Sequence, residues 1–139
     1  MKPISVVSVL LLCCAPAFGG DSPAPAEAQK RLAAYQEQIG PTFIHVWKAA
    51  AAVDATNGIG EDEAYVLSAA YLYAYINGCS SIRALHDQGD RWLAETRVGE
   101  PPGEPGPPIT VEKASGATSA PKVETVRDPK VYLTFAQQI

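Results

Sequence analysis

The residue types that carry catalysis or metal binding are scarce in this sequence, and their spacing matches none of the common catalytic motifs. The two histidines, His45 and His86, lie outside His-Glu-x-x-His and related ligand spacings. No Gly-x-Ser-x-Gly elbow and no phosphate-binding glycine loop is present, and Cys79 shows no sequence sign of activation as a thiolate. We therefore predict a protein that is not an enzyme and that has no catalytic residue, bound metal or cofactor.

A histidine beside a carboxylate in a pocket is the arrangement that would reverse this prediction. Asp54 or Asp87 next to His45 or His86 would form a pair able to act as general acid and base. The alternative function is thus a small exported enzyme, or a ligand-binding protein that uses a pocket between helices and sheet. A lone histidine on a half-buried strand is more often structural, which favours binding over turnover.

Acidic residues near expected turns and helix starts are the candidate binding residues. The triplet Glu61, Asp62 and Glu63 is explained most simply by stabilisation of a helix N-terminus, and Asp87 and Asp90 flank a predicted turn. The formal net charge is −4, so exposed carboxylates would steer a basic partner toward the chain. We predict another protein, with a basic surface, as the partner. The expected partner-binding residues are Glu61, Asp62, Asp87 and Asp90.

The composition indicates one domain that binds no nucleic acid and does not cross a membrane. The 139 residues are 47% apolar and 19% charged, which is enough to bury a core. Lys and Arg form no stripe that would neutralise phosphates, which excludes a nucleic-acid interface. No apolar run reaches the roughly 18 residues that a transmembrane helix needs.

The N-terminus predicts a secretory signal peptide at 1–19, because a positive start, an apolar run and a group of small residues follow one another there. We therefore expect a periplasmic or secreted protein. After cleavage Cys79 is the one cysteine left, so no intramolecular disulfide forms. A lipid anchor on Cys13 or Cys14 is the alternative, although neither follows the small residue that lipidation normally requires.

The first half of the mature chain has the three- and four-residue spacing of amphipathic helices. Gly40-Pro41 interrupts this spacing, so we predict two helices, at about 24–39 and 41–56. Asn57-Gly58 supplies a stop for the second helix. A third helix follows and ends at Asn77-Gly78.

From Ser80 the pattern changes to the alternation of antiparallel strands. Two strands meet in a hairpin at Gly89-Asp90, and Trp92 is the expected core anchor. Further strands are predicted at 109–113 and 123–127. The predicted fold class is α+β, with N-terminal helices packed on one face of a three- to four-stranded antiparallel meander.

A Pro/Gly-rich loop at 99–108 interrupts the single α+β domain that we expect residues 20–139 to form. Pro101, Pro105 and Pro108 recur at a spacing near that of a polyproline II helix, which is typical of ligands for aromatic grooves. We favour the simpler interpretation, a rigid exposed hairpin loop, because short proline runs are common in loops.

A pattern of turn and strand residues resembles the sheet half of small bacterial proteins with a nuclear transport factor 2-like or cystatin-like fold. It consists of Gly89-Asp90-Arg91-Trp92, Gly99, the run from Pro108 to Gly116 and Asp128-Pro129, and it covers about 61–133. In that group a Gly-Asp-x-Trp turn opens one strand, and a strand with a Lys-x-x-Gly end, here Lys113 to Gly116, closes a hairpin. Several members are immunity proteins that neutralise secreted toxins. The resemblance thus implies an exported inhibitor that acts by occluding its partner, and it implies that this basic partner is a secreted toxin.

Export generates the first testable prediction. In protein purified from the cell envelope, mass spectrometry should find a mature N-terminus between about Ala17 and Ser22, within the small-residue window of a signal peptidase. Intact protein that begins at Met1 in the cytosol would contradict the prediction. A diacylglycerol mass on Cys13 or Cys14 would establish the lipid-anchored alternative instead.

Overall fold

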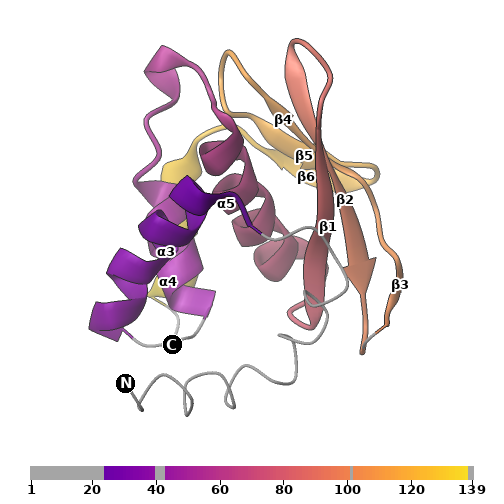
Figure 1. The fold of residues 1–139 in the computed structure, drawn as a ribbon, viewed down its shortest axis with the longest axis horizontal. Helices are drawn as coiled ribbons and strands as arrows, with labels where there is room; N and C mark the ends of the chain where they lie inside the picture. Colours follow the sequence, from indigo (N-terminus) through magenta and orange to yellow (C-terminus); the bar gives the residue numbers. More distant parts are fainter. Residues whose placement is uncertain (1–23, 40–42, 101, 138–139) are drawn as a thin grey trace.

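The computed structural model describes residues 24–39, 43–100 and 102–137 and has an α+β fold, as predicted (Figure 1). The expected signal peptide, with Cys13 and Cys14, lies outside these residues. The helices before the sheet are α3 (Ala26–Ile39), α4 (Phe43–Ala51) and α5 (Glu61–Tyr71). The strands are β1 (Ser80–Asp87), β2 (Arg91–Val98), β3 (Glu104–Pro105), β4 (Ile109–Glu112), β5 (Thr118–Ala120) and β6 (Val123–Val126). A short helix, α6 (Tyr132–Ala136), follows the sheet.

The second predicted helix is shorter than its sequence pattern suggests. Helix α4 ends at Ala51, and a separate 3₁₀ turn spans Ala55–Asn57. The Asp54 carboxylate accepts the Thr56 N–H at 3.0 Å, a local bond that competes with continuation of the helix. Gly58, with φ of +88°, ends this 3₁₀ turn and not α4, so the prediction that Asn57-Gly58 stops the second helix is wrong.

Helix α5 is buried on every side and not on one face alone. All residues from Ala64 to Tyr71 are buried. The helix contacts α3 and α4 on one side and β1, β2, β4 and β5 on the other (Figure 1). Its last part continues as a π-helical segment, Leu72–Ile76, and ends at Asn77, as predicted.

The sheet is antiparallel, with the strand order β1-β2-β4-β5-β6 and with β3 paired to β2. The predicted hairpin at Gly89-Asp90 joins β1 to β2, and the predicted strands appear as β4 and β6. Strands β3 and β5 were not predicted. With two and three residues they are too short to show alternation.

The prediction that Trp92 anchors the core is wrong. Trp92 is half-buried, whereas Trp47 on α4 is 6% exposed and packs between Phe43 and Phe135, with ring centroids at 6.0 and 5.6 Å. The Trp47 indole N–H also donates to the Ala70 carbonyl of α5 at 3.1 Å. The helix-facing side of the sheet is filled instead by smaller residues of β1, β2, β4 and β6, namely Ile82, Ala94, Ile109, Val111 and Val126.

The described residues contain no helix that is both long and apolar enough to cross a membrane. Cys79, at the end of the chain segment that leads into β1, forms no disulfide.

Truncation of the two tryptophans tests the corrected core. Trp47→Ala should lower the free energy of unfolding by about 3–5 kcal/mol, the range for a large buried aromatic residue. Trp92→Ala should lower it by less, because part of that side chain is already in water. Urea unfolding followed by circular dichroism measures both values. An equal or larger loss for Trp92→Ala would show that the sheet, and not α4, holds the main aromatic anchor.

Candidate functional site

Three connections meet at one end of the molecule, and their backbones are hydrogen-bonded to one another. They are the segment 52–60 before α5, the β1–β2 turn at 88–90 and the β4–β5 turn at 113–117, and we call them together the loop end (Figure 1). The Ile59 N–H donates to the Lys113 carbonyl at 2.9 Å, and the Lys113 N–H donates to the Asp90 carbonyl at 3.0 Å. These bonds fix the three connections relative to each other.

Side chains reinforce the loop end. The Trp92 indole N–H donates to the Ile59 carbonyl at 2.9 Å, so the half-buried Trp92 ties the sheet to the segment before α5. Gly116, with φ of +78°, lies so near this segment that a Cβ there would come within 3.2 Å of the Ala55 Cβ. A side chain at position 116 would therefore push the two connections apart.

Lys113 is the charged residue that links the strands at this end. Its ammonium lies 2.6 Å from the Asp87 carboxylate and 4.7 Å from the centroid of the Trp92 ring, in a cation–π arrangement. Sequence reasoning missed this role, because the two charged partners are far apart in the chain and only the strand pairing brings them together.

Asp87, one of the predicted binding residues, has a structural task. Besides the Lys113 ion pair, its carboxylate accepts the Gly89 N–H at 2.9 Å and so closes the β1–β2 turn. The hydrogen bond from Lys113 and then the one from Gly89 lower the pKa of Asp87 below its ordinary value. Asp87 is therefore less available to a partner than the sequence suggested.

Asp90 lies in the same turn and is far more exposed. Its side chain keeps 76% of its surface in solvent and, among the described residues, forms an ion pair only with the adjacent Arg91, at 3.1 Å. The hydrogen bond and charge of Arg91 lower the pKa of Asp90, which keeps the carboxylate ionised. Of the two predicted residues in this turn, Asp90 is the one that presents its charge to solvent.

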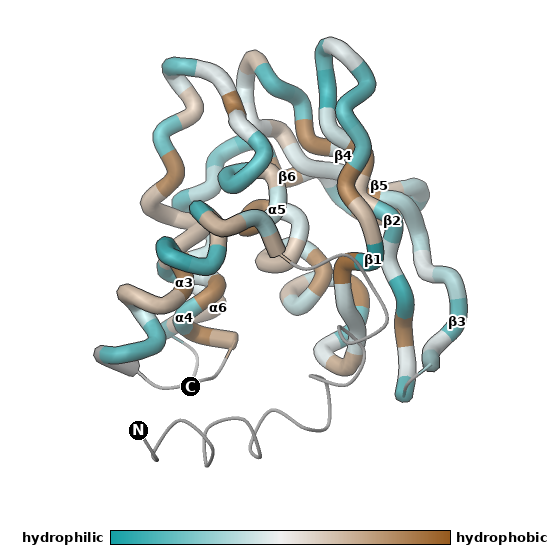
Figure 2. The backbone as a smooth tube through the Cα atoms, in the orientation of Figure 1, coloured by the Kyte–Doolittle hydropathy of each residue, from teal (hydrophilic) through white to brown (hydrophobic). Residues whose placement is uncertain are grey.

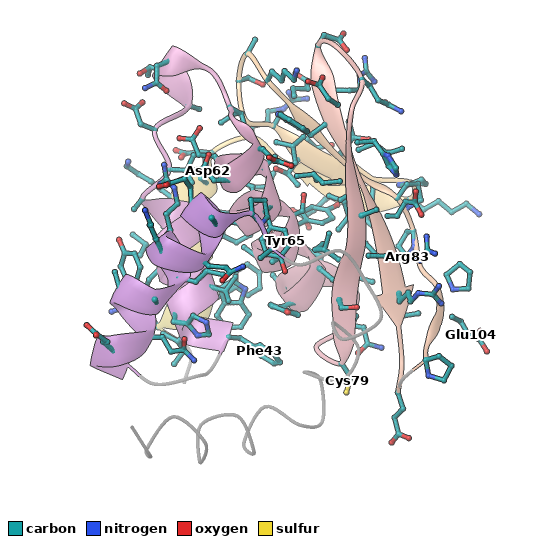
Figure 3. All side chains as sticks on the ribbon, in the orientation of Figure 1. Phe43, Asp62, Tyr65, Cys79, Arg83 and Glu104 are labelled. Atoms are coloured by element: carbon teal, nitrogen blue, oxygen red, sulfur yellow. The ribbon has the colours of Figure 1, made fainter. Side chains whose placement is uncertain are left out.

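The acidic triplet begins α5, which agrees with the helix-start interpretation. The Glu63 carboxylate accepts the Gly60 N–H at 2.9 Å, as in a capping box. Asp62 accepts a hydrogen bond from Arg31 of α3 at 2.7 Å, and it lies beside that helix in Figure 3. Glu61 is exposed and forms no ion pair with the other described residues.

The loop end surrounds an open hollow of about 550 Å³ between the start of α5 and the end of β4. Its lining combines two cations, one carboxylate and loop backbone: Arg31, Asn57, Gly58, Ile59, Gly60, Glu63 and Lys113. The connection tips around it are mostly hydrophilic (Figure 2). Both cations are already paired with carboxylates of this end, so the hollow has no unbalanced positive charge that would hold an anion.

His86 pairs with a carboxylate that sequence reasoning did not consider. It contacts the Glu95 carboxylate and not Asp87. Glu95 also pairs with Arg83 at 3.2 Å, and these bonds, that of His86 first, lower the pKa of Glu95. Since Ala94 is buried on the helix side, alternation places Glu95 on the outer face of the sheet. Asp54, the other carboxylate that sequence reasoning considered, accepts hydrogen bonds from Thr56.

A second, smaller hollow of about 240 Å³ runs along β1 where the helices meet the sheet. Its lining is Pro25, Glu61, Tyr65, Ile82, Arg83, Ala84, Leu85 and His86. It thus holds one histidine and one carboxylate, although typical ligand pockets have about 300–1,000 Å³. Among the residues that the structure describes, no group of His, Cys, Asp and Glu could hold a metal ion.

Comparison with known proteins gives no match: no family model, no curated protein and no solved structure is similar to this chain. The resemblance to the nuclear transport factor 2-like and cystatin-like group therefore stays a prediction.

The lowered pKa of Asp87 predicts how stability depends on pH. A carboxylate whose pKa is lower in the folded than in the unfolded chain stabilises the fold above its unfolded pKa, and this contribution is lost as the pH falls through the folded value. Asp87→Asn keeps an oxygen for the Gly89 N–H but removes the ion pair. As the pH falls below about 5, the free energy of unfolding should therefore decrease less for the variant than for the parent.

Urea midpoints measured across this pH range give the comparison. Asp54, Asp90 and Glu95 also have lowered pKa values. The pH dependence of stability should therefore weaken in the variant and not vanish. Glu100→Gln, at an exposed position, removes one carboxylate as a control. If Asp87→Asn and Glu100→Gln followed the same pH curve, the Asp87–Lys113 pair would contribute nothing to the fold.

Proposed function

We propose that this chain is an exported protein-binding protein that neutralises a basic secreted toxin by occluding it, as immunity and inhibitor proteins do. The loop end is the observation that carries this proposal. Three connections held together by backbone hydrogen bonds present exposed carboxylates on a fixed surface. A surface that is ordered before binding loses little conformational entropy in the complex, which favours tight stoichiometric association.

Charge supports a basic partner. Within the loop end and the first turn of α5, Asp62 and Asp87 are paired with cations of the chain itself. Glu61 and Asp90 keep their carboxylates toward solvent. Carboxylates at the rim of an interface mainly raise the association rate and its dependence on salt, whereas buried anchors set the lifetime of the complex. Glu61 and Asp90 are thus the better candidates for steering.

The alternative, a small-ligand protein or enzyme, is favoured by one observation: His86 and Glu61 line the same hollow along β1. Its volume of about 240 Å³ would admit only a small ligand. The His86 imidazole is also exposed and already bonded to Glu95. These features support binding of a protein partner over turnover of a substrate.

The test begins with the genes beside this one. A neighbouring gene for a secreted hydrolase supplies the candidate toxin, and co-expression with this chain should restore growth. Size-exclusion chromatography with light scattering should then show a stable complex of fixed stoichiometry. Growth arrest that this chain does not relieve, with no complex, would contradict the proposed function for that toxin.

Charge reversal in the loop end and in the first turn of α5 tests the binding surface. Glu61→Lys combined with Asp90→Lys should slow association with the basic toxin on the order of tenfold and flatten its salt dependence. Stopped-flow association at several salt concentrations measures both effects. Glu37→Lys combined with Glu124→Lys, which makes the same charge change at exposed positions of α3 and β6, is the matched control. An equal effect of the control would show that net charge, and not the loop end, steers the toxin.

The histidines separate the two candidate functions. His45→Ala and His86→Ala should leave protection against the toxin intact, because occlusion uses neither imidazole. Growth protection and a thermal melt of each variant are the measurements. Loss of protection by a variant that still folds would replace occlusion with a histidine-containing pocket.

A further inference from the structure

The Pro/Gly-rich segment has a defined course along the sheet. Residues 104–108 run antiparallel to β2, and β3 pairs Glu104 with Val98 and Pro105 with Arg97. The chain rejoins the β2 ladder where Ile109 of β4 pairs with Ala94. Strand pairing is thus interrupted only between β3 and β4, where Pro107 and Pro108 have no N–H to donate.

Hydrogen bonds and small residues hold this segment against β2. The Gly106 N–H donates to the Thr96 carbonyl at 2.9 Å, and the Thr96 hydroxyl donates to the Pro107 carbonyl at 2.9 Å. A Cβ on Gly106 would collide with the Thr96 hydroxyl. Glycine at 106 is therefore what lets the backbone approach β2 this closely.

The opposite side of the segment is a row of prolines in solvent. Pro102, Pro105 and Pro108 are exposed, whereas Gly103, Gly106 and Pro107 are partly buried. Pro105 and Pro108 are three residues apart, which is the repeat of a polyproline II helix. Gly103, with φ of +74°, separates Pro102 from this repeat. We call residues 104–108 the proline ridge. Pro101, part of the sequence pattern, lies outside the described residues.

The backbone of the ridge is preset by its sequence. The ring of each proline fixes φ near −65°, and the residue before a proline is driven toward extended or polyproline II conformation. Glu104, Gly106 and Pro107 each precede a proline. The prolines therefore restrict residues 104–108 to the extended and polyproline II region before any partner arrives, which lowers the entropy lost on binding.

We propose that the proline ridge is a docking site for a protein groove lined with aromatic rings that binds prolines in polyproline II form. The groove would have a basic rim, because Glu100 and Glu104 are exposed at the ridge, and Glu104 points away from the sheet in Figure 3. This surface lies apart from the loop end and does not depend on the proposed toxin binding. Pro105 and Pro108 fill the groove, and the β2 contacts keep them presented to it.

The probes are three purified proline-reading proteins, namely an SH3 domain, a WW domain and profilin, titrated into the ¹⁵N-labelled mature chain. At least one should shift the amide signals of Gly103, Glu104 and Gly106, and a proline decamer peptide should reverse the shifts. Pro105→Ala combined with Pro108→Ala should weaken this binding by about tenfold or more, as for an interface anchor.

Pro121→Ala is the matched control, since Pro121 is an exposed proline in the β5–β6 turn. This variant should bind as the parent does, and thermal melts establish that each variant folds. If no probe shifted the ridge amides, or if the double variant bound like the parent, the proposal would be overturned. Concentration-dependent association of the double variant with unchanged probe binding would also overturn it, by showing that the prolines only protect a sheet edge.

Discussion

The burial of α5 on every side is the constraint on which the rest of the structure depends. A helix without a solvent face must be covered by other elements around its whole circumference. Helices α3 and α4 cover one side and the sheet covers the other. The small side chains of Ala64, Ser68 and Ala69 suit this position, because they let both layers approach the helix axis. Trp47 then joins α4 to α5 through its bond to the Ala70 carbonyl.

The position of α5 also determines where the loop end can form. The segment 52–60 must lead from α4 into a helix that lies against the sheet, so it reaches the sheet beside the β1–β2 and β4–β5 turns. Hydrogen bonds from Ile59 to Lys113 and from Trp92 to Ile59 then fix it there. The partly exposed Trp92 is thus explained by a bond at the margin of the core and not by burial.

Local signals in the sequence were sufficient to predict most of the helices and strands. Contacts between residues that are far apart in the chain explain what these signals missed. The helix end at Asn77 and the hairpin at Gly89-Asp90 depend on residues that favour turns wherever they occur. Which of the two tryptophans is more deeply buried depends on which layers pack together. The spacing of apolar residues along a helix does not contain that information. For the candidate site, sequence reasoning placed Asp87 and Asp90 at a turn between two strands, and the structure has them there. It did not separate Asp87 from Asp90, because Lys113 reaches Asp87 only through the strand pairing.

The difference between the contacts of Asp87 and those of Asp90 bears on how a small domain can bind a partner without losing stability. A carboxylate that closes a turn and pairs with a lysine cannot exchange its contacts for those of a partner without loosening the turn. Asp90 can, since its ion pair with Arg91 is largely in water and such pairs contribute little to stability. The same division exists on the proline ridge, where Gly106 holds the backbone and Pro105 faces solvent. In both places one residue holds the backbone and a nearby residue faces solvent. Binding of the proposed partner to the exposed residue would therefore leave the contacts that maintain the fold intact.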